Sequence, residues 1–187
     1  MSSAPTRGGP RGAARRPPSV RRPPRRVEVS VDGVRHPRWE AELPRFCSRA
    51  LREAGYASWD ISFLLCGDKR MTELNDKYRR KKTPTDVLSF PREARAGGTP
   101  PRAAVEAVAG DLAISLDTMR RNAAEFGCTE DEELKRLTVH GLLHLAGMDH
   151  GRGRGGPMLE LQERLLESLH RVHVIRGGAG RTGERGS

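Results

Sequence analysis

TEDEELKRLTVHGLLHLAGMDH, from Thr129 to His150, is the stretch that decides how this chain folds. Thr129 and Glu132 form a T-x-x-E capping box, a signature of helix N-termini. We therefore expect a helix that begins after Thr129 and carries His140 and His144. Residues four positions apart on a helix lie about 40° apart, one turn above each other. The two imidazoles can therefore point at one metal ion.

Gly147 decides whether a third histidine can join this pair. A continued helix would carry His150 about 15 Å along the axis from His140, onto another face. Glycine tolerates the left-handed conformation that ends helices, so the chain can turn at Gly147 and bring His150 back. Three neutral imidazoles with an open fourth position are typical of a catalytic zinc site. The stretch thus predicts one zinc ion on His140, His144 and His150, with nickel, iron and copper left open.

The alternative is a partly buried helix whose histidines satisfy one another or face water. Zinc proteases share this spacing, in the pattern H-E-x-x-H-x-x-G-x-x-H, but they keep a glutamate general base where this chain has Gly141. The stretch therefore favours metal-assisted hydrolysis and counts against proteolysis. Asp149 is expected to orient the turn or to hydrogen-bond a ligand.

The net charge of +10 comes from the two ends of the chain. Residues 1–26 contain eight arginines and no acid, and residues 174–187 contain three arginines and one glutamate. Removing these from the totals of 34 basic and 24 acidic residues leaves 23 of each in residues 27–173. We expect residues 27–173 to form one domain between a disordered Arg/Pro-rich tail and a flexible C-terminal tail. A transit peptide is the weaker interpretation of residues 1–26, because the prolines oppose an amphipathic helix.

A basic segment stands out within the neutral part, in NDKYRRKKTPTDVLSFP (75–91). Five of the six residues from Lys77 to Lys82 are basic. One interpretation is a solvated helix end, where cations suit the helix dipole. The other is a phosphate-binding edge, because arginine grips phosphate oxygens bidentately and lysine acts as a point charge.

Between the tails, short strands and amphipathic helices alternate without a regular βαβ order, which predicts an α+β domain. Strands are expected at 27–31, 57–66, 86–90 and 110–115. Helices are expected at 37–55, 69–80, from 116 to Gly127, from Thr129 through the histidine pair, and at 157–173. A loop is expected at 91–107. His170 and His173 should lie on the polar face of the last helix, and His36 in a loop. Trp39, Phe46, Trp59 and Phe63 are expected in the core.

Two features absent from the sequence bear on where in the cell the protein is found. No apolar run approaches the ~18 residues that a membrane span needs, and no signal peptide is evident. Cys47, Cys66 and Cys128 are widely spaced and odd in number, which indicates free thiols in a reducing compartment. We therefore expect a cytoplasmic protein without a membrane partner.

The motifs N-x-x-Y-R, PTDVLSFP, GDLAIS and HGLLHLAGMDH, in this order, resemble the YbeY family of metal-dependent endoribonucleases that mature ribosomal RNA. The resemblance implies an α+β fold with a small mixed four-stranded sheet packed with helices, and a zinc site on a helix-turn in a cleft beside a basic surface. It implies that His140, His144 and His150 are the zinc ligands. Arg79 matches the arginine that lines the cleft and is thought essential for RNA cleavage.

The resemblance also implies the reaction, which is hydrolysis of single-stranded RNA by a zinc-activated water, in 16S ribosomal RNA 3′ end processing and ribosome quality control. Arg79 and His140 would be catalytic residues, and Arg79, Arg80, Lys81 and Lys82 would contact RNA. The partners would be ribosomal RNA and ribosomal proteins. The chain departs from the family at Met148, usually tyrosine, and in GRGRGG (151–156), often acidic.

Several alternatives remain. Asp86 and Asp149 are candidates for the general base, although a structural role is expected for each, and attack by the 2′-hydroxyl of the RNA is a further possibility. A zinc peptidase is weakened by Gly141. A zinc-stabilised module that binds ribosomal RNA or a ribosomal protein without catalysis would need no exchangeable ligand position and should tolerate the loss of Arg79.

Overall fold

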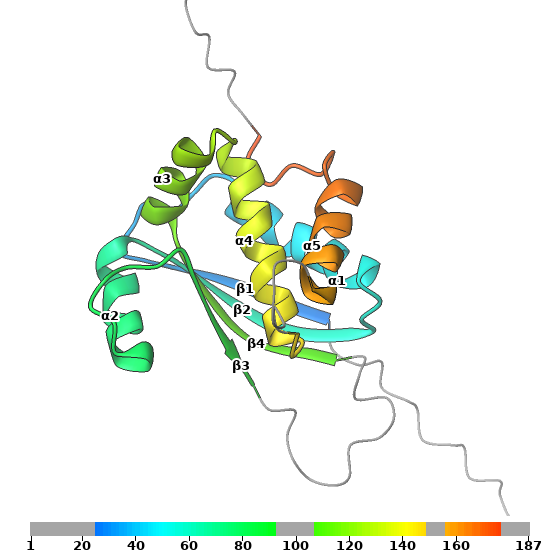
Figure 1. The fold of residues 1–187 in the computed structure, drawn as a ribbon, viewed down its shortest axis with the longest axis horizontal. Coiled ribbons are helices and arrows are strands. Elements are labelled where there is room, and N and C mark those ends of the chain that lie inside the picture. Colours follow the sequence, from blue (N-terminus) through cyan, green and yellow to red (C-terminus); the bar gives the residue numbers. More distant parts are fainter. Residues whose placement is uncertain (1–24, 93–106, 149–155, 177–187) are drawn as a thin grey trace, which may run out of the picture.

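The computed structural model describes residues 25–92, 107–148 and 156–176. Its strands are β1 (Arg25–Asp32), β2 (Ser58–Cys66), β3 (Val87–Pro91) and β4 (Ala107–Ser115). Its helices are α1 (Leu43–Glu53), α2 (Asp68–Arg79), α3 (Leu116–Phe126), α4 (Glu130–Leu145) and α5 (Pro157–Ser168), with a 3-10 turn at Glu40–Glu42 (Figure 1). The expected tails lie almost entirely outside the described residues, as do Asp149, His150 and the GRGRGG segment up to residue 155.

The four strands form one mixed sheet in the order β1-β2-β4-β3. β1 pairs in parallel with β2 and β2 pairs in parallel with β4, whereas β3 runs antiparallel to β4. β3 is therefore an edge strand, and the prediction of an α+β fold with a mixed four-stranded sheet is confirmed.

The two faces of the sheet are covered unequally. Alternate residues of β2, including Trp59, Ile61 and Phe63, point into the main core, where α1 and α4 pack and α5 lies beside α4 (Figure 1). The opposite face has a small second core, in which Leu88 of β3 packs with Met71 of α2. As a result, α2 and α4 lie on opposite sides of the β3 edge.

The two predicted helices that contain proline differ from the observed ones. The helix expected at 37–55 starts only at Leu43, because Pro44 occupies its first turn and the preceding residues form a 3-10 turn. The helix expected at 157–173 ends at Ser168, after which the chain turns and buries Val174 in the main core. The prediction that His170 and His173 lie on the last helix is therefore wrong, although both are exposed as expected.

Other expectations are met. Phe46, Trp59 and Phe63 are buried, and Trp39 packs against the same core from a partly exposed position. His36 lies outside any helix or strand. All three cysteines are free, and burial raises the pKa of the Cys66 thiol to about 11. No helix within the described ranges is long and apolar enough to cross a membrane.

Helix α4 lies so close to the sheet that two contact positions admit only glycine without rearrangement. A Cβ on Gly141 of α4 would lie 2.6 Å from Leu112 Cδ2 on β4. A Cβ on Gly110 of β4 would lie 2.6 Å from both Leu145 Cδ2 and the backbone oxygen of Phe90. The two glycines thus set the height of α4 above the strands.

Substituting Gly110 with alanine should therefore destabilise the fold strongly. The new methyl group meets a backbone oxygen that cannot move away, at a φ of 157° that L-residues rarely adopt. We expect a loss of about 3–5 kcal/mol in the free energy of unfolding, measured by urea denaturation. Gly33→Ala is the control, because it has positive φ but open space, and it should cost about 1–2 kcal/mol. Equal losses would contradict the close approach of α4.

Candidate metal centre and basic edge

The two ends of α4 form as the sequence predicts. At the N-terminus, the Thr129 hydroxyl accepts from the Glu132 N–H at 3.2 Å, and the Glu132 carboxylate accepts from the Thr129 N–H at 2.8 Å. At the C-terminus, Gly147 has a φ of 81°, and the Met148 N–H donates to the carbonyl of Leu143. This is the left-handed break that a return of the chain towards the helix requires.

His140 and His144 lie side by side on the last two turns of α4. Their ring centroids are 4.7 Å apart and their planes are inclined by 80°. Both side chains are partly exposed, although the helix around them is largely buried. The predicted pairing of two imidazoles on one face is therefore present.

The hydrogen bonds of the two rings determine which nitrogen carries the proton. His144 Nδ1 lies 3.1 Å from the carbonyl oxygen of Met148, which can only accept, so Nδ1 is the donor. His140 Nδ1 lies 2.9 Å from Gln162 Oε1, and Nδ1 donates there too. In the neutral rings the lone pair then resides on Nε2, the usual arrangement when histidine binds a metal through Nε2. The donor chemistry of this pair therefore fits a zinc ion.

The third predicted ligand, His150, lies outside the described residues. Within the part of the chain that the structure describes, no group of three or more His, Cys, Asp or Glu side chains is placed to hold a metal ion. The ligand set of His140, His144 and His150 therefore remains a prediction.

The hydrogen bond between Gln162 and His140 is the contact of this site that the sequence did not predict. Gln162 is buried on α5, in line with the apolar residues Met158 and Leu165. A polar residue at helical spacing within an apolar stripe was the available signal, but its partner His140 is 22 positions away.

Gly141 and Asp86 have structural roles. Gly141 faces Leu112 in the core, so the position that holds a glutamate in zinc proteases points away from the histidine pair here. The Asp86 carboxylate accepts from the Val87 N–H at 2.8 Å and lies 3.5 Å from Arg136, and the Asp86 carbonyl accepts from the Ser115 N–H. These contacts support the expected structural role of Asp86.

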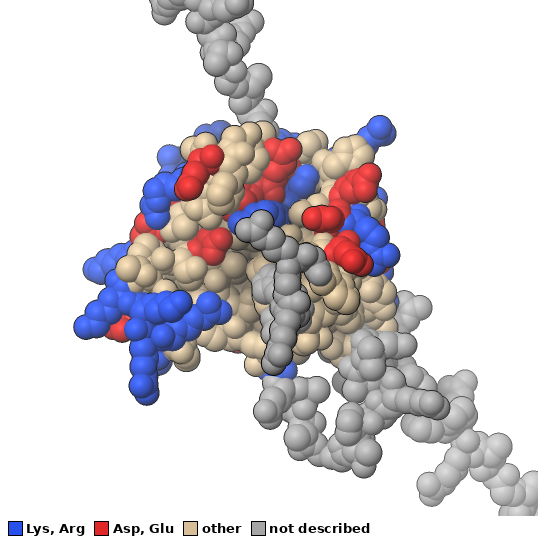
Figure 2. Space-filling model, viewed as in Figure 1, with Lys and Arg blue, Asp and Glu red and all other residues tan. Residues whose placement is uncertain are grey.

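We use the name basic edge for the side chains of Lys77, Arg79, Arg80, Lys81 and Lys82. All five are exposed at the C-terminal end of α2 and in the turn after it, where Figure 2 shows a mainly blue surface at the lower left with a small red area in it. None of the five pairs with a carboxylate of the described residues. Nearby arginines do, as in Arg70 with Asp32 and Arg121 with Asp68. The positive charge of the basic edge is therefore not neutralised by these parts of the protein.

The turn after α2 is held in an unusual conformation. Arg80 has a φ of 57° and is the one non-glycine residue with positive φ among the described residues. The Lys81 N–H donates to the Asn75 carbonyl, and the buried Asn75 side chain donates to the Thr83 carbonyl at 2.7 Å. These bonds fix the direction of the basic edge.

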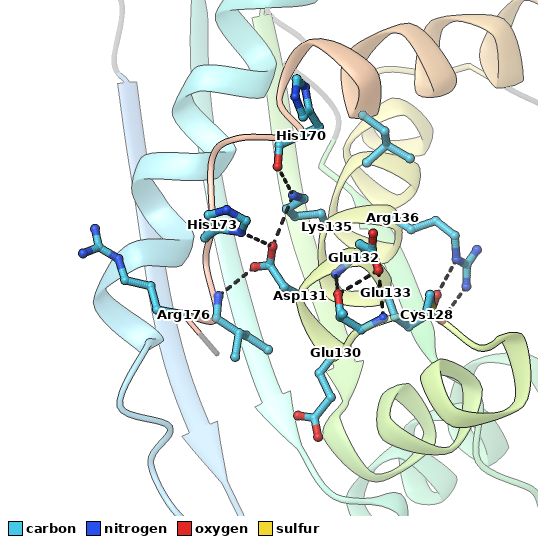
Figure 3. A pocket seen from close by; sticks show the side chains of 13 residues that line it. Cys128, Glu130, Asp131, Glu132, Glu133, Lys135, Arg136, His170, His173 and Arg176 are labelled. Carbon is cyan, nitrogen blue, oxygen red and sulfur yellow. Dashed lines mark hydrogen bonds and ion pairs between the residues drawn. The ribbon is translucent and has the colours of Figure 1, made fainter. Parts of the chain in front are cut away.

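A pocket of about 810 Å³ lies at the other end of α4, roughly 14 Å along the helix axis from the histidine pair (Figure 3). Asp131 lies at its centre and is almost buried. Its carboxylate accepts from the N–H groups of Val174 and Ile175 at 2.7 and 2.8 Å, and pairs with Lys135 at 3.2 Å. This carboxylate anchors the segment that follows α5, and its contacts explain why that helix stops early.

Asp131 should contribute to stability in a pH-dependent way. Burial alone would raise the pKa of Asp131, but hydrogen bonds from Ile175, His173 and Val174 hold it below its usual value. A lowered folded-state pKa gives stabilisation that is present above the unfolded pKa of about 3.9 and is lost as pH falls through the folded value.

Asp131→Asn is therefore expected to reduce the free energy of unfolding at pH 7 by about 2–4 kcal/mol. The difference from the wild type should shrink below about pH 4, which denaturant titrations at both pH values would measure. Glu130→Gln, an exposed neighbour 3.7 Å from Arg120, should cost less than about 1 kcal/mol. A pH-independent loss for Asp131→Asn would argue against the carboxylate anchor.

The fold and its side chains fit the class of hydrolases that act on phosphodiester bonds, and comparison with known proteins agrees. The profile of the family described as Endoribonuclease YbeY matches residues 28–170. The chain therefore belongs to the YbeY endoribonuclease family, which confirms both the expected family and the expected enzyme class.

Individual relatives cover most of the chain. A Treponema denticola protein described as Endoribonuclease YbeY is 41% identical over 152 residues, which span 79% of this chain and 90% of the relative. An Aquifex aeolicus protein with the same description is 40% identical over 133 residues, 70% of this chain and 84% of the relative. The solution structure of TM1509 from Thermotoga maritima has a TM-score of 0.55 at 21% identity and covers 83% of this chain and 99% of that one. This last likeness supports the fold alone.

Proposed function

We propose that this chain hydrolyses phosphodiester bonds in single-stranded RNA, with one zinc ion held by His140, His144 and His150. The observation that carries the proposal is the histidine pair on α4, whose hydrogen bonds give both neutral rings the same tautomer. A pair that only satisfied itself on a helix surface would not require both Nδ1 atoms to donate to protein oxygens.

In this proposal, one set of residues orients the metal ligands and another binds the phosphate. Gln162 and the Met148 carbonyl hold the two imidazole rings in orientation, which leaves each Nε2 as the ligand nitrogen. When bound, zinc lowers the pKa of its water towards ~7 and so supplies hydroxide at neutral pH. Arg79 holds the scissile phosphate and stabilises the negative charge that develops on it. Catalysis thus depends on the orientation of the two imidazole rings and on the positive charge of Arg79.

Arg80, Lys81 and Lys82 would track the flanking RNA backbone. An acidic surface repels a single strand and a neutral one does not attract it, but five cations without a carboxylate partner among the described residues offer a place where phosphates replace counterions. The conformation of Arg80 supports this role. Glycine is the usual residue at positive φ, so an arginine here costs folding stability.

The cellular role is proposed on the resemblance of the motifs alone. It comprises 16S ribosomal RNA 3′ end processing and ribosome quality control in the cytoplasm, with ribosomal RNA and ribosomal proteins as partners. The basic edge is the surface that would meet such an RNA. A zinc-stabilised, non-catalytic module would bind RNA at the same edge, so cleavage is the property that separates the two functions.

Cleavage of an end-labelled single-stranded RNA by the purified chain tests the activity. We expect Arg79→Ala to slow cleavage by about 100- to 1,000-fold, because it removes a charge aimed at the reacting phosphate. His144→Ala and treatment with a chelator should abolish metal-dependent cleavage, and added zinc should restore only the chelated wild type.

Two matched variants serve as controls. His170→Ala removes an exposed histidine and Arg45→Ala an exposed arginine, and neither residue lies on α2 or on the C-terminal turns of α4. Both variants should cleave RNA normally. If the folded, zinc-loaded wild type binds RNA but does not cleave it, the proposed hydrolysis is wrong and the chain acts as an RNA-binding module. Equal cleavage in every sample would reveal a contaminating nuclease.

Arg80 offers a test in which stability and RNA binding move in opposite directions. Arg80→Gly should raise the free energy of unfolding by about 1 kcal/mol, because glycine accepts the left-handed conformation. The same change should weaken RNA binding and reduce the salt slope of the affinity by about 0.7, the value for one contact to a single strand.

Arg80→Ala is the matched variant, because it removes the charge but keeps the backbone strain. It should weaken RNA binding as much as Arg80→Gly without the gain in stability. Thermal denaturation and fluorescence anisotropy at several salt concentrations measure both quantities. An Arg80→Gly protein with the wild-type salt slope would exclude Arg80 from the RNA contact.

A further inference from the structure

Tyr78 is a large aromatic side chain placed in the middle of the basic edge and left exposed. The described residues contain two exposed large hydrophobic side chains, Tyr78 at 55% and Phe126 at 60%. Phe126 lies at the end of α3, beneath the guanidinium of Arg136. Tyr78 instead lies between Lys77 and Arg79, which have no carboxylate partner in the described part of the chain.

The Tyr78 ring is supported from within the protein. Its centroid lies 4.8 Å from that of Phe90, with the planes inclined by 62°. Phe90 in turn packs against the small core of Met71 and Leu88 on the α2 side of the sheet. An edge-on contact of this kind holds an aromatic ring in place while part of it stays open to solvent. Tyr78 is thus held in position as well as exposed.

We propose that Tyr78 is a stacking platform for one nucleobase of a single-stranded RNA bound along the basic edge. The inference rests on the proposed function, which it extends from phosphate contacts to a base contact. Binding of single strands combines cations that follow the backbone with aromatic faces on which bases stack. Tyr78 supplies the face, and the cations on both sides supply the charge.

Lys77 competes with a base for the ring. Its Nζ lies 5.1 Å from the Tyr78 centroid, which is a cation–π contact at an exposed site. Such a contact is weaker than stacking of a base on an aromatic ring. A base therefore displaces the Lys77 ammonium, which is free to move on its flexible stem to the phosphate of the stacked nucleotide.

The platform and the histidine pair flank the same end of β3. Phe90, which supports Tyr78, is the penultimate residue of this edge strand. The backbone oxygen of Phe90 borders the space beside Gly110 from one side, and the side chain of Leu145, the neighbour of His144, borders it from another. A strand of RNA that stacks on Tyr78 and crosses the β3 edge therefore heads towards the α4 histidines.

The test measures binding of a short 2′-O-methyl oligoribonucleotide, which lacks the reactive 2′-hydroxyl, to the full chain in the presence of chelator. One position carries 2-aminopurine, whose fluorescence reports stacking. Tyr78→Leu should weaken binding by about 5- to 100-fold, and Tyr78→Phe, which keeps the aromatic face, by no more than about twofold. Phe126→Leu removes the other exposed ring and should leave binding unchanged.

Two further measurements separate stacking from a structural role. An oligonucleotide in which every base is absent should bind wild type and Tyr78→Leu equally. The salt slope should be the same for both proteins, because no phosphate contact is lost. Thermal denaturation shows whether Tyr78→Leu is folded. If it is not, the 2-aminopurine fluorescence decides, because stacking on the ring should quench it on binding to wild type and to Tyr78→Phe, and unchanged fluorescence would overturn the platform.

The outcomes distinguish this inference from the proposed function. If the chain cleaves RNA but Tyr78→Leu binds the base-containing oligonucleotide as well as wild type does, the platform is wrong and the enzyme stands. If Tyr78→Leu weakens binding but no protein cleaves RNA under any condition, the stacking platform is supported and the proposed catalytic function is wrong. An equal loss of affinity for the base-containing and the baseless oligonucleotide would overturn stacking.

Discussion

The close approach of α4 to the sheet is the constraint on which the other features depend. Gly141 and Gly110 let the helix lie nearer to β4 than any side chain at these positions would permit. This contact fixes both the height and the rotation of α4, and hence the direction in which His140 and His144 point. It also explains the missing glutamate of zinc proteases, since position 141 faces the core.

The charged side chains fall into two groups with different tasks. Carboxylates near the N-terminal end of α4 are committed to the fold, with Asp131 anchoring the segment after α5 and Glu133 pairing with Arg136. Cations at the end of α2 have no such partners among the described residues, and Arg80 is held in a conformation that opposes folding. The first group stabilises the domain, whereas the second leaves charge available for a polyanion.

Local signals in the sequence predicted most of this structure, and long-range ones were missed. The Thr129 capping box, the break at Gly147 and the period-two strands each depend on neighbouring residues, and each is present. The early end of α5 depends on Asp131, some 40 positions away, and the tautomer of His140 depends on Gln162. Such contacts arise only when the elements pack, so no local pattern encodes them. The position of the exposed Tyr78 ring likewise depends on a contact with Phe90, which lies on another element.

The most direct test of the metal centre is X-ray absorption at the zinc K-edge, on the full chain loaded with one equivalent of zinc. The proposed site predicts three imidazole nitrogens at about 2.0–2.1 Å and one exchangeable oxygen, with a change of the shell in His144→Ala. A shell that contains sulfur at about 2.3 Å, or four protein ligands, would indicate a different or a structural site. Failure to retain stoichiometric zinc would contradict the assignment of the α4 histidines as its ligands.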